Sequence, residues 1–312
     1  MSRRLITILM SLIACAASSL VASPVQRTFV STSGLDTNPC SRPQPCRSFA
    51  AAIGQTLSGG EVYVLDSGGY GGGANITQAI TIRADGVTAG VSVGSGLDGI
   101  DINAGPNDVV TLHGLTINGV GGNDGVSFVS GGALHLEDLT VANMNLQGVE
   151  MTATGKMDVI DSTFRDNIHN TGLFVHPIGG LPGLVSVDNC RFERNNTGVR
   201  IDDGGQAIVR NSIAVSNQSL GFLAETTGGS NALLMLESCL SAENNYGISA
   251  QFFGQGAPGV YISNVTVYGN AIGLQMTNVP GDPFFGGIYS FGNNSIDGNL
   301  TNGAPIGTIP RM

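Results

Sequence analysis

A glycine followed by a bulky apolar residue recurs at nearly constant spacing through more than half of this chain. Successive pairs are 26, 23, 24, 26, 23, 26 and 26 residues apart. This spacing is too regular for chance and too short for two parallel strands joined by a crossover helix. It predicts a solenoid, in which functional residues are sought in columns across successive coils. The pairs are Gly99-Ile100, Gly125-Val126, Gly148-Val149, Gly172-Leu173, Gly198-Val199, Gly221-Phe222, Gly247-Ile248 and Gly273-Leu274.

The composition favours short strands joined by tight turns. The 312 residues include 47 glycines and no tryptophan, and only 12% of them are charged. The chain also has little helical periodicity, which argues against an α fold.

Each coil from Gly99 onward contains three short apolar segments. The first strand follows the glycine, the second follows a turn of variable length, and a short bend leads to the third. An asparagine-rich corner closes the coil, and its amides are expected to form a ladder between coils. Three faces per coil predict an all-β fold, a single three-faced parallel β-helix. The corner asparagines are Asn118, Asn143, Asn167, Asn195, Asn217, Asn244 and Asn270.

Residues 24–98 are expected to form an N-terminal cap and the first coils. Residues 28–31 are predicted to be a strand and residues 47–57 a short amphipathic helix. The end of a stack of coils exposes unpaired backbone groups and an open core, so we expect this helix to cover it. The repeats are assigned to residues 99–298 and a C-terminal tail to residues 299–312.

The first residues have the pattern of an export signal. Arg3 and Arg4 precede an apolar stretch, which predicts a signal peptide over residues 1–23 and a secreted, periplasmic or cell-surface protein. The segment ending at Cys15 also resembles a lipobox, so a lipoprotein anchored at Cys15 is the alternative. We expect no integral membrane span in the mature chain. Loss of both arginines changes the net charge from -10 to -12, which argues against a nucleic-acid partner.

Four cysteines outside that segment form two contrasting pairs. Cys40 and Cys46 lie in a short proline-rich loop of a chain expected to be exported, and we predict a disulfide between them. Cys190 and Cys239 occupy the same place in coils two apart, which puts their Cα atoms ~10 Å apart, beyond disulfide reach. They are predicted to be buried, free thiols.

Three segments carry a family resemblance: residues 33–39 (SGLDTNP), 45–53 (PCRSFAAAI) and 59–64 (GGEVYV). With the asparagine-cornered repeats, they make the chain similar to right-handed parallel β-helix proteins of the pectate-lyase-like superfamily, in particular secreted bacterial β-helix repeat proteins. That superfamily includes pectin and alginate lyases, polysaccharide hydrolases, uronate epimerases, tailspikes and adhesins. The resemblance implies the fold and a polysaccharide or cell-surface glycan as partner, but no particular activity.

Charged residues gather on the outward positions of the first strands in the middle coils. Asp202 and Glu225, on successive coils ~5 Å apart, could share a proton, bind a cation or flank a glycosidic bond. His176 and Arg200 could act as acid and charge stabiliser. These four are the catalytic candidates; alternatively, Arg200 only neutralises the two carboxylates. One outward column reads Asp101, Ser127, Glu150, Phe174, Arg200, Leu223, Ser249, Gln275, and the next reads Asn103, Val129, Thr152, His176, Asp202, Glu225, Gln251, Thr277.

Four further residues are predicted to bind substrate. Glu150 and Asp203 border the catalytic candidates, and Phe252 and Phe253 could offer aromatic platforms to a sugar, although doubled phenylalanines also serve loop packing or subunit contacts. No metal site and no cofactor are assigned, with calcium as the one cation considered. The oligomeric state is left open.

Two functions remain in competition. The first is an exported protein that binds glycans or cell-surface polymers without catalysis, which explains why the superfamily's catalytic signatures are missing; Lys156, for example, is expected in a turn rather than in a strand. The alternative is a polysaccharide lyase or glycoside hydrolase that uses the outward carboxylate, histidine and arginine cluster.

Overall fold

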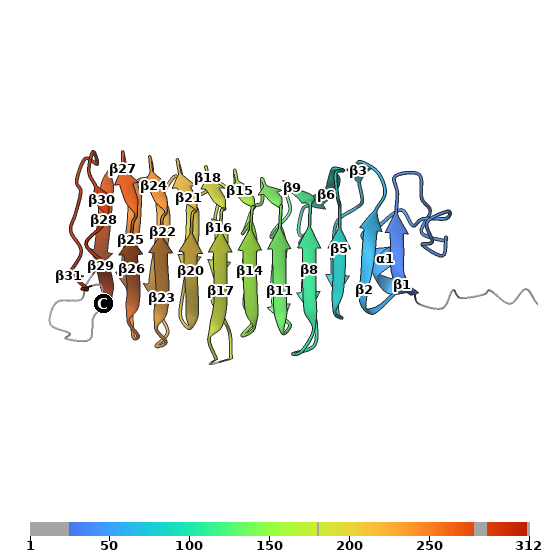
Figure 1. The fold of residues 1–312 in the computed structure, drawn as a ribbon, viewed down its shortest axis with the longest axis horizontal. Coiled ribbons are helices and arrows are strands. Elements are labelled where there is room, and N and C mark those ends of the chain that lie inside the picture. Colours follow the sequence, from blue (N-terminus) through green and yellow to red (C-terminus); the bar gives the residue numbers. More distant parts are fainter. Residues whose placement is uncertain (1–24, 180, 278–285, 311–312) are drawn as a thin grey trace, which may run out of the picture.

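A computed structural model describes residues 25–179, 181–277 and 286–310. Its strands stack into an elongated solenoid (Figure 1). Within the described residues they form three sheets of nine, 12 and 10 strands, and neighbouring strands in each sheet are parallel. We call these the first, second and third sheets, because they contain the first, second and third strands of successive coils. The predicted all-β, three-faced parallel β-helix is confirmed.

The spatial order of the strands within each sheet follows the order of the coils. The first sheet contains β28 (Ile272–Thr277), β25 (Tyr246–Phe252), β22 (Leu220–Thr226), β19 (Thr197–Ile201), β16 (Thr171–Val175), β13 (Val149–Met151), β10 (Val126–Ser130), β7 (Ile100–Asn103) and β4 (Ala74–Ile76). The second contains β1 (Val25–Val30), β2 (Thr56–Val64), β5 (Ile80–Arg83), β8 (Val109–His113), β11 (Ala133–Glu137), β14 (Lys156–Ile160), β17 (Gly183–Asp188), β20 (Gly205–Arg210), β23 (Ala232–Glu237), β26 (Pro258–Ser263), β29 (Gly287–Ser290) and β31 (Gly307–Thr308). The third contains β3 (Gly68–Gly69), β6 (Ala89–Gly94), β9 (Leu115–Val120), β12 (Thr140–Ala142), β15 (Thr163–Arg165), β18 (Arg191–Glu193), β21 (Ile213–Val215), β24 (Leu240–Ala242), β27 (Thr266–Tyr268) and β30 (Ser295–Ile296).

Alternation of buried and exposed residues along each strand builds the core. In β20, Ala207 and Val209 are buried, whereas Gln206 and Ile208 face outward. The same position on successive coils stacks inside the solenoid, as Phe164 and Phe192 do with ring centroids 5.1 Å apart. The interior is therefore one continuous apolar column along the helix axis.

The recurring glycine is required by the closeness of neighbouring coils. A Cβ atom at Gly148 would lie 2.5 Å from the carbonyl oxygen of Gly172, and one at Gly198 would lie 2.5 Å from that of Gly221. Neither obstacle is a flexible side-chain end, so any other residue would push the coils apart.

The register confirms most of the outward columns expected on the first sheet. Glu150 pairs with Phe174, and Phe174 pairs with Arg200 on the next strand. The exception is Val129. The register between β10 and β7 shifts by one residue there, so that Ser130, and not Val129, lies opposite Asn103. A local bulge explains this correction, because an extra residue displaces the rest of the strand.

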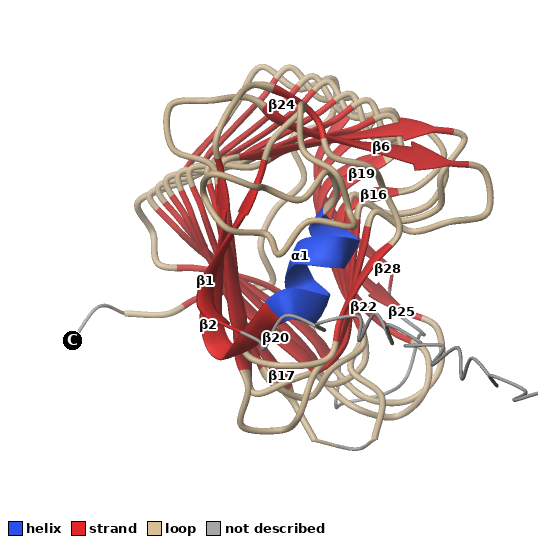
Figure 2. Ribbon diagram, turned by 90° about the vertical axis from the view of Figure 1, so that its right-hand side faces the viewer, coloured by secondary structure: helices blue, strands red, loops and turns tan. Residues whose placement is uncertain are grey.

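One short helix covers the N-terminal end of the stack (Figure 2). This helix, α1 (Phe49–Gln55), begins at Ser48, whose hydroxyl accepts a hydrogen bond from the Ala51 N–H, and it buries Phe49 and Ile53 against the first coils. The predicted capping helix is confirmed, but it is shorter than residues 47–57. Thr56 adopts an extended backbone and begins β2 instead.

The cysteines behave as predicted. Cys40 and Cys46 form a disulfide, whereas Cys190 and Cys239 are free and buried. Burial raises the pKa of the Cys190 thiol to about 12 and that of Cys239 to about 11. Both thiols therefore lack the thiolate character of a nucleophile.

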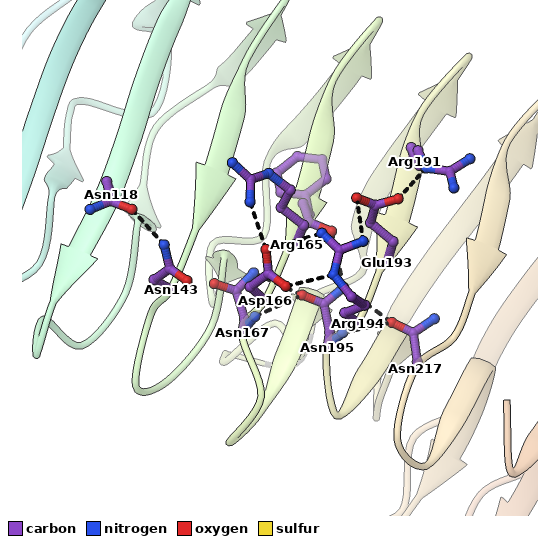
Figure 3. A network of polar contacts seen from close by, with 11 residues as sticks. Asn118, Asn143, Arg165, Asp166, Asn167, Arg191, Glu193, Arg194, Asn195 and Asn217 are labelled. Carbon is purple, nitrogen blue, oxygen red and sulfur yellow. Dashed lines mark hydrogen bonds and ion pairs between the residues drawn. The ribbon is translucent and has the colours of Figure 1, made fainter.

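Asparagine side chains form the expected ladder between coils (Figure 3). Asn195 donates from Nδ2 to Asn217 Oδ1 at 3.2 Å, and Asn217 donates to Asn244 Oδ1 at 3.0 Å. The buried ladder comprises Asn167, Asn195, Asn217, Asn244 and Asn270 and continues to Asn299 and Asn302.

Two of the predicted ladder residues lie elsewhere. Asn143 donates to Asn118 on the exposed side of the corner, and Asn118 belongs to strand β9. The ladder position of that coil is taken by buried Met144, whose N–H donates to Asn167 Oδ1. At this corner the ladder position is one residue away from the asparagine that the sequence repeat predicts. This corrects the prediction for Asn118 and Asn143.

Several predictions depend on parts of the chain that the structure leaves out. The signal peptide over residues 1–23 and the lipidation alternative at Cys15 lie outside the described residues. The proposed domain boundaries also stay predictions. Within residues 299–312, β31 pairs with β29. In residues 25–179, 181–277 and 286–310, no helix combines the length and apolar character that a membrane span needs.

The ladder predicts a contrast between two asparagine substitutions. Asn217→Ala should lower the free energy of unfolding by about 2 to 4 kcal/mol, because buried groups on both neighbouring coils lose a partner. Asn118→Ala removes one exposed contact and should cost less than about 1 kcal/mol. Urea unfolding of both variants tests this, and equal losses would contradict a structural role for the ladder.

The thiols give a second prediction. In the folded protein, Cys190 and Cys239 should resist iodoacetamide at pH 8, and both should react once the chain is unfolded in urea. Peptide mass mapping measures the labelling and should also recover Cys40 linked to Cys46. Rapid labelling of either thiol before unfolding would show that its coil opens readily.

Candidate functional site

The predicted catalytic residues lie together on the outward face of the first sheet. We define the charged patch as Glu150, Phe174, His176, Arg200, Asp202 and Glu225. Strands β13, β16, β19 and β22 supply its central residues, and His176 and Asp202 directly follow β16 and β19. Parallel pairing places these residues on neighbouring coils, although up to 75 positions separate them in sequence.

Arg200 connects the two carboxylates predicted to be catalytic. Its Nε donates to Asp202 Oδ1 at 3.0 Å and its Nη2 donates to Asp202 Oδ2 at 2.8 Å. The same Nη2 reaches Glu225 Oε1 on the next coil at 3.0 Å. One guanidinium therefore fixes the orientation of both acids, as a bidentate arginine does.

A second pair adjoins the first through an aromatic ring. His176 Nε2 lies 3.0 Å from Glu150 Oε1, and this contact bridges two neighbouring coils. The imidazole also stacks on Phe174, with ring centroids 4.4 Å apart, and the Arg200 guanidinium lies 4.8 Å from the centroid of the same phenylalanine. Phe174 therefore joins the two pairs into one patch.

Burial and pairing act differently on the three carboxyl groups. Burial raises the pKa values of Asp202 and Glu225 above their ordinary values, although Arg200 acts in the opposite direction. The side chains of these two residues are only 11% and 12% exposed. The hydrogen bond with His176 lowers the pKa of Glu150, which outweighs the effect of its burial.

These contacts limit the chemistry available to the charged patch. Each of the four catalytic candidates already has a partner within the patch. This is also expected if Arg200 only neutralises Asp202 and Glu225. A paired carboxylate nevertheless keeps lone pairs that can accept further hydrogen bonds. In the part of the chain that the structure describes, no group of three or more His, Cys, Asp or Glu side chains is placed to hold a metal ion.

The other predicted substrate-binding residues lie at the margins of the patch. Asp203 accepts hydrogen bonds from the N–H groups of Thr227 and Gly228, so its carboxylate braces the turn of the next coil. Phe252 ends β25, where it pairs with Thr226 in the ladder, and Phe253 follows with 61% of its surface exposed. The structure therefore brings Glu150 into the patch and places the two phenylalanines on the far side of Glu225.

Sequence reasoning missed an acidic corner beside the patch. Asp98 and Asp124 each precede the recurring glycine, and Gln147 holds that place in the next coil. The Gln147 N–H donates to Asp124 Oδ1 at 2.6 Å, and the Asp124 N–H donates to Asp98 Oδ1 at 3.1 Å. The repeated Asp-Gly step is the signal in the sequence, because Asp98 and Asp124 occupy the same position before the glycine in successive coils.

The acidic corner retains protons near neutral pH. Burial raises the pKa of Asp124, which is 5% exposed, to about 7. Burial and hydrogen bonding to Asp98 raise the pKa of Asp101 to about 6. Two carboxyl groups of this kind share a proton because adjacent negative charges are unfavourable.

A separate ion-pair network lies on the third sheet beside the asparagine ladder (Figure 3). Arg194 donates to Asp166 at 2.7 Å and lies 2.9 Å from Glu193. Arg165 also pairs with Asp166, and Arg191 with Glu193. The network fixes consecutive coils, and each of its arginines is engaged by a carboxylate.

The acidic corner predicts a specific dependence of stability on pH. The folded chain keeps the Asp124 proton up to about pH 7, whereas the unfolded chain loses it near pH 4, so Asp124 destabilises the fold increasingly as pH rises between these values. Asp124→Asn keeps an oxygen for the Gln147 N–H and removes the charge. It should therefore be more stable than the parent at pH 8, by a few kcal/mol.

Thermal unfolding of both proteins from pH 4 to pH 8 measures this effect, and the advantage of Asp124→Asn should disappear towards pH 4. Asp188→Asn, on the second sheet, is the control. An Asp124→Asn variant no more stable than the parent at pH 8 would contradict the buried, protonated state of Asp124.

A comparison with protein families agrees with this fold. Residues 98–250 match the family described as the right-handed β-helix region. Solved structures similar to the chain include pectate lyase Pel9A, with 15% identity over 86% of this chain and 74% of the lyase at a TM-score of 0.47. An alginate lyase from Paenibacillus sp. str. FPU-7 has 12% identity over 84% of this chain and 99% of its own, with a TM-score of 0.44. No curated protein sequence matches.

The family match covers the central coils, and the same three parallel sheets continue on both sides of it. The described residues therefore form a parallel β-helix, and residues 98–250 of it are similar to the right-handed β-helix region.

Proposed function

We propose that this protein binds an uncharged glycan on the outward face of its first sheet and does not cleave it. The observation that carries the proposal is the Arg200 clamp, which holds Asp202 and Glu225 as fixed acceptors. Carboxylates positioned in this way accept strong, charge-assisted hydrogen bonds from sugar hydroxyls. Their lone pairs remain available, whereas the charge of Arg200 is already neutralised.

The balance of charge argues against a polyuronate ligand. Three carboxylates of the charged patch, those of Glu150, Asp202 and Glu225, face one arginine, Arg200. A negatively charged polymer would be repelled by this face. Arginines on the third sheet offer no alternative, since carboxylates engage them.

The face extends beyond the charged patch as a polar strip. The Gln251 amide donates to the Ser249 hydroxyl at 3.1 Å, and that hydroxyl donates to Gln275 Oε1 at 3.2 Å. Ser249 itself is buried, whereas Glu225, Gln251 and Gln275 offer donors and acceptors on three successive coils, ~4.8 Å apart. A linear polymer lying along the helix axis could contact each coil in turn.

Export and metal independence complete the proposal. The N-terminal pattern over residues 1–23 and the Cys40–Cys46 disulfide support an oxidising, extracytoplasmic location. Binding is expected to be unchanged by calcium or by a chelator, because the patch carboxylates are engaged by Arg200 and His176.

A polysaccharide lyase or glycoside hydrolase is the second candidate. The observation in its favour is the Asp98 and Asp101 pair, because a carboxyl group protonated near pH 6 can serve as a general acid. Lyase activity would produce an unsaturated product that absorbs in the ultraviolet, and hydrolysis would produce reducing ends.

A matched pair of substitutions tests the binding site. Glu225→Gln should weaken binding of a neutral glycan by about 5- to 10-fold, because an amide oxygen is a weaker acceptor than a carboxylate. Glu237→Gln disrupts the comparable Arg210–Glu237 pair, with an N···O distance of 3.1 Å, on the second sheet and should leave affinity unchanged. A glycan array that includes polygalacturonate and alginate selects the ligand, and calorimetry with and without calcium measures the affinities.

Melting temperatures and both product assays accompany these measurements. Full affinity in Glu225→Gln would remove the charged patch from the proposal and direct attention to Phe253. Product formation that Asp101→Asn abolishes would favour the enzymatic candidate instead.

A further inference from the structure

The second sheet carries an apolar groove that the proposed glycan site does not use. The groove has a volume of about 430 Å³ and crosses β14, β17, β20, β23 and β26. These strands stand side by side in Figure 1, and Figure 2 shows β17 and β20 on a different side of the solenoid from β16 and β22. The groove is therefore independent of the charged patch.

Its lining is aliphatic at positions that face outward. Leu184 on β17 and Ile208 on β20 are 40% and 37% exposed, and Leu233 and Met235 on β23 continue the same surface. Gly259 lies opposite Leu233, whose side chain packs over it: a Cβ atom at Gly259 would lie 3.1 Å from Leu233 Cδ2. Outward strand positions are usually polar when they face water, so this contiguous apolar surface indicates a ligand.

The two ends of the groove differ in chemistry. Lys156, the one lysine of the sequence, lies at one end, where it pairs in the ladder with Leu184. It begins strand β14, which corrects the expectation that it lies in a turn. Among the ion pairs of the described residues, Lys156 takes part in none, whereas the neighbouring Asp158 faces His135 at 3.1 Å. At the other end, Tyr261 stacks on Tyr289 with ring centroids 5.3 Å apart.

We propose that this groove binds one free long-chain fatty acid, with its carboxylate paired to Lys156 and its chain lying across β17, β20 and β23. Four strand spacings separate β14 from β26, a span of ~19 Å. A bilayer core of ~30 Å contains two opposed acyl chains, so one chain needs ~15 Å. The groove thus matches the ligand in length, in apolar character and in the charge at one end.

Other occupants fit the lining less well. A glycan needs many hydrogen-bonding partners, but between Lys156 and Tyr261 the polar side chains of the groove are only Asp158, Ser186 and Gln206. A second copy of this acidic chain would bring like net charge to the contact and would leave the Lys156 ammonium without an assigned anion. These alternatives become outcomes of the test.

The test is fluorescence titration of the purified protein with cis-parinaric acid, followed by displacement with palmitate below its micelle concentration. Saturable binding at one site per chain is expected. Ile208→Asp should weaken palmitate binding by more than about tenfold, because it places a charge in the apolar groove. Val120→Asp, at an exposed position on the third sheet, is the matched control and should bind normally.

Lys156 is tested through the head group of the ligand. Lys156→Gln should weaken palmitate binding by about 5- to 10-fold and leave binding of uncharged hexadecanol unchanged, whereas Lys156→Arg should retain both. Circular dichroism confirms that each variant folds. Absence of saturable binding, equal binding in Ile208→Asp, displacement by neutral oligosaccharides, or a dimer dissociated by Ile208→Asp in sedimentation would each overturn the proposal. None of these outcomes depends on glycan binding at the charged patch.

Discussion

The close, parallel stacking of coils is the constraint from which the other features of this molecule follow. Strands repeat at ~4.8 Å along the axis, so each residue contacts its counterparts in the coils before and after. Inward positions must then fill a continuous core, and the glycine column must admit the carbonyl oxygens of the next coil. The asparagine ladder satisfies the buried backbone groups of the corner in the same way.

This stacking also turns distant sequence positions into compact chemical groups. Arg200 reaches a carboxylate 25 residues later, and Glu150 meets His176 across 26 residues. The three faces are chemically distinct: the first sheet presents carboxylates and amides, the second an aliphatic groove, and the third a closed ion-pair network. A single fold thus offers separate surfaces to different ligands.

The sequence predicted the fold and most of the charged patch because both depend on regular periodicity. A repeat of constant phase assigns Glu150, Arg200 and Glu225 to outward positions without further information. The errors arise where the phase changes locally. A bulge displaces Val129, and Asn143 lies one residue away from the ladder position held by Met144. Pairing partners and burial, which decide the protonation of Asp124, depend on side-chain packing that periodicity does not describe.

The glycine column has a consequence for how such a chain can change in evolution. Because a side chain at Gly148 or Gly198 would collide with the following coil, a short insertion near the column would move a non-glycine residue into the clash. Duplication or loss of a complete unit of 23 to 26 residues keeps a glycine in the column at both junctions. The solenoid can therefore lengthen or shorten only in whole steps of ~4.8 Å. The length of each sheet along the axis, and so the length of ligand it can contact, changes by one coil at a time.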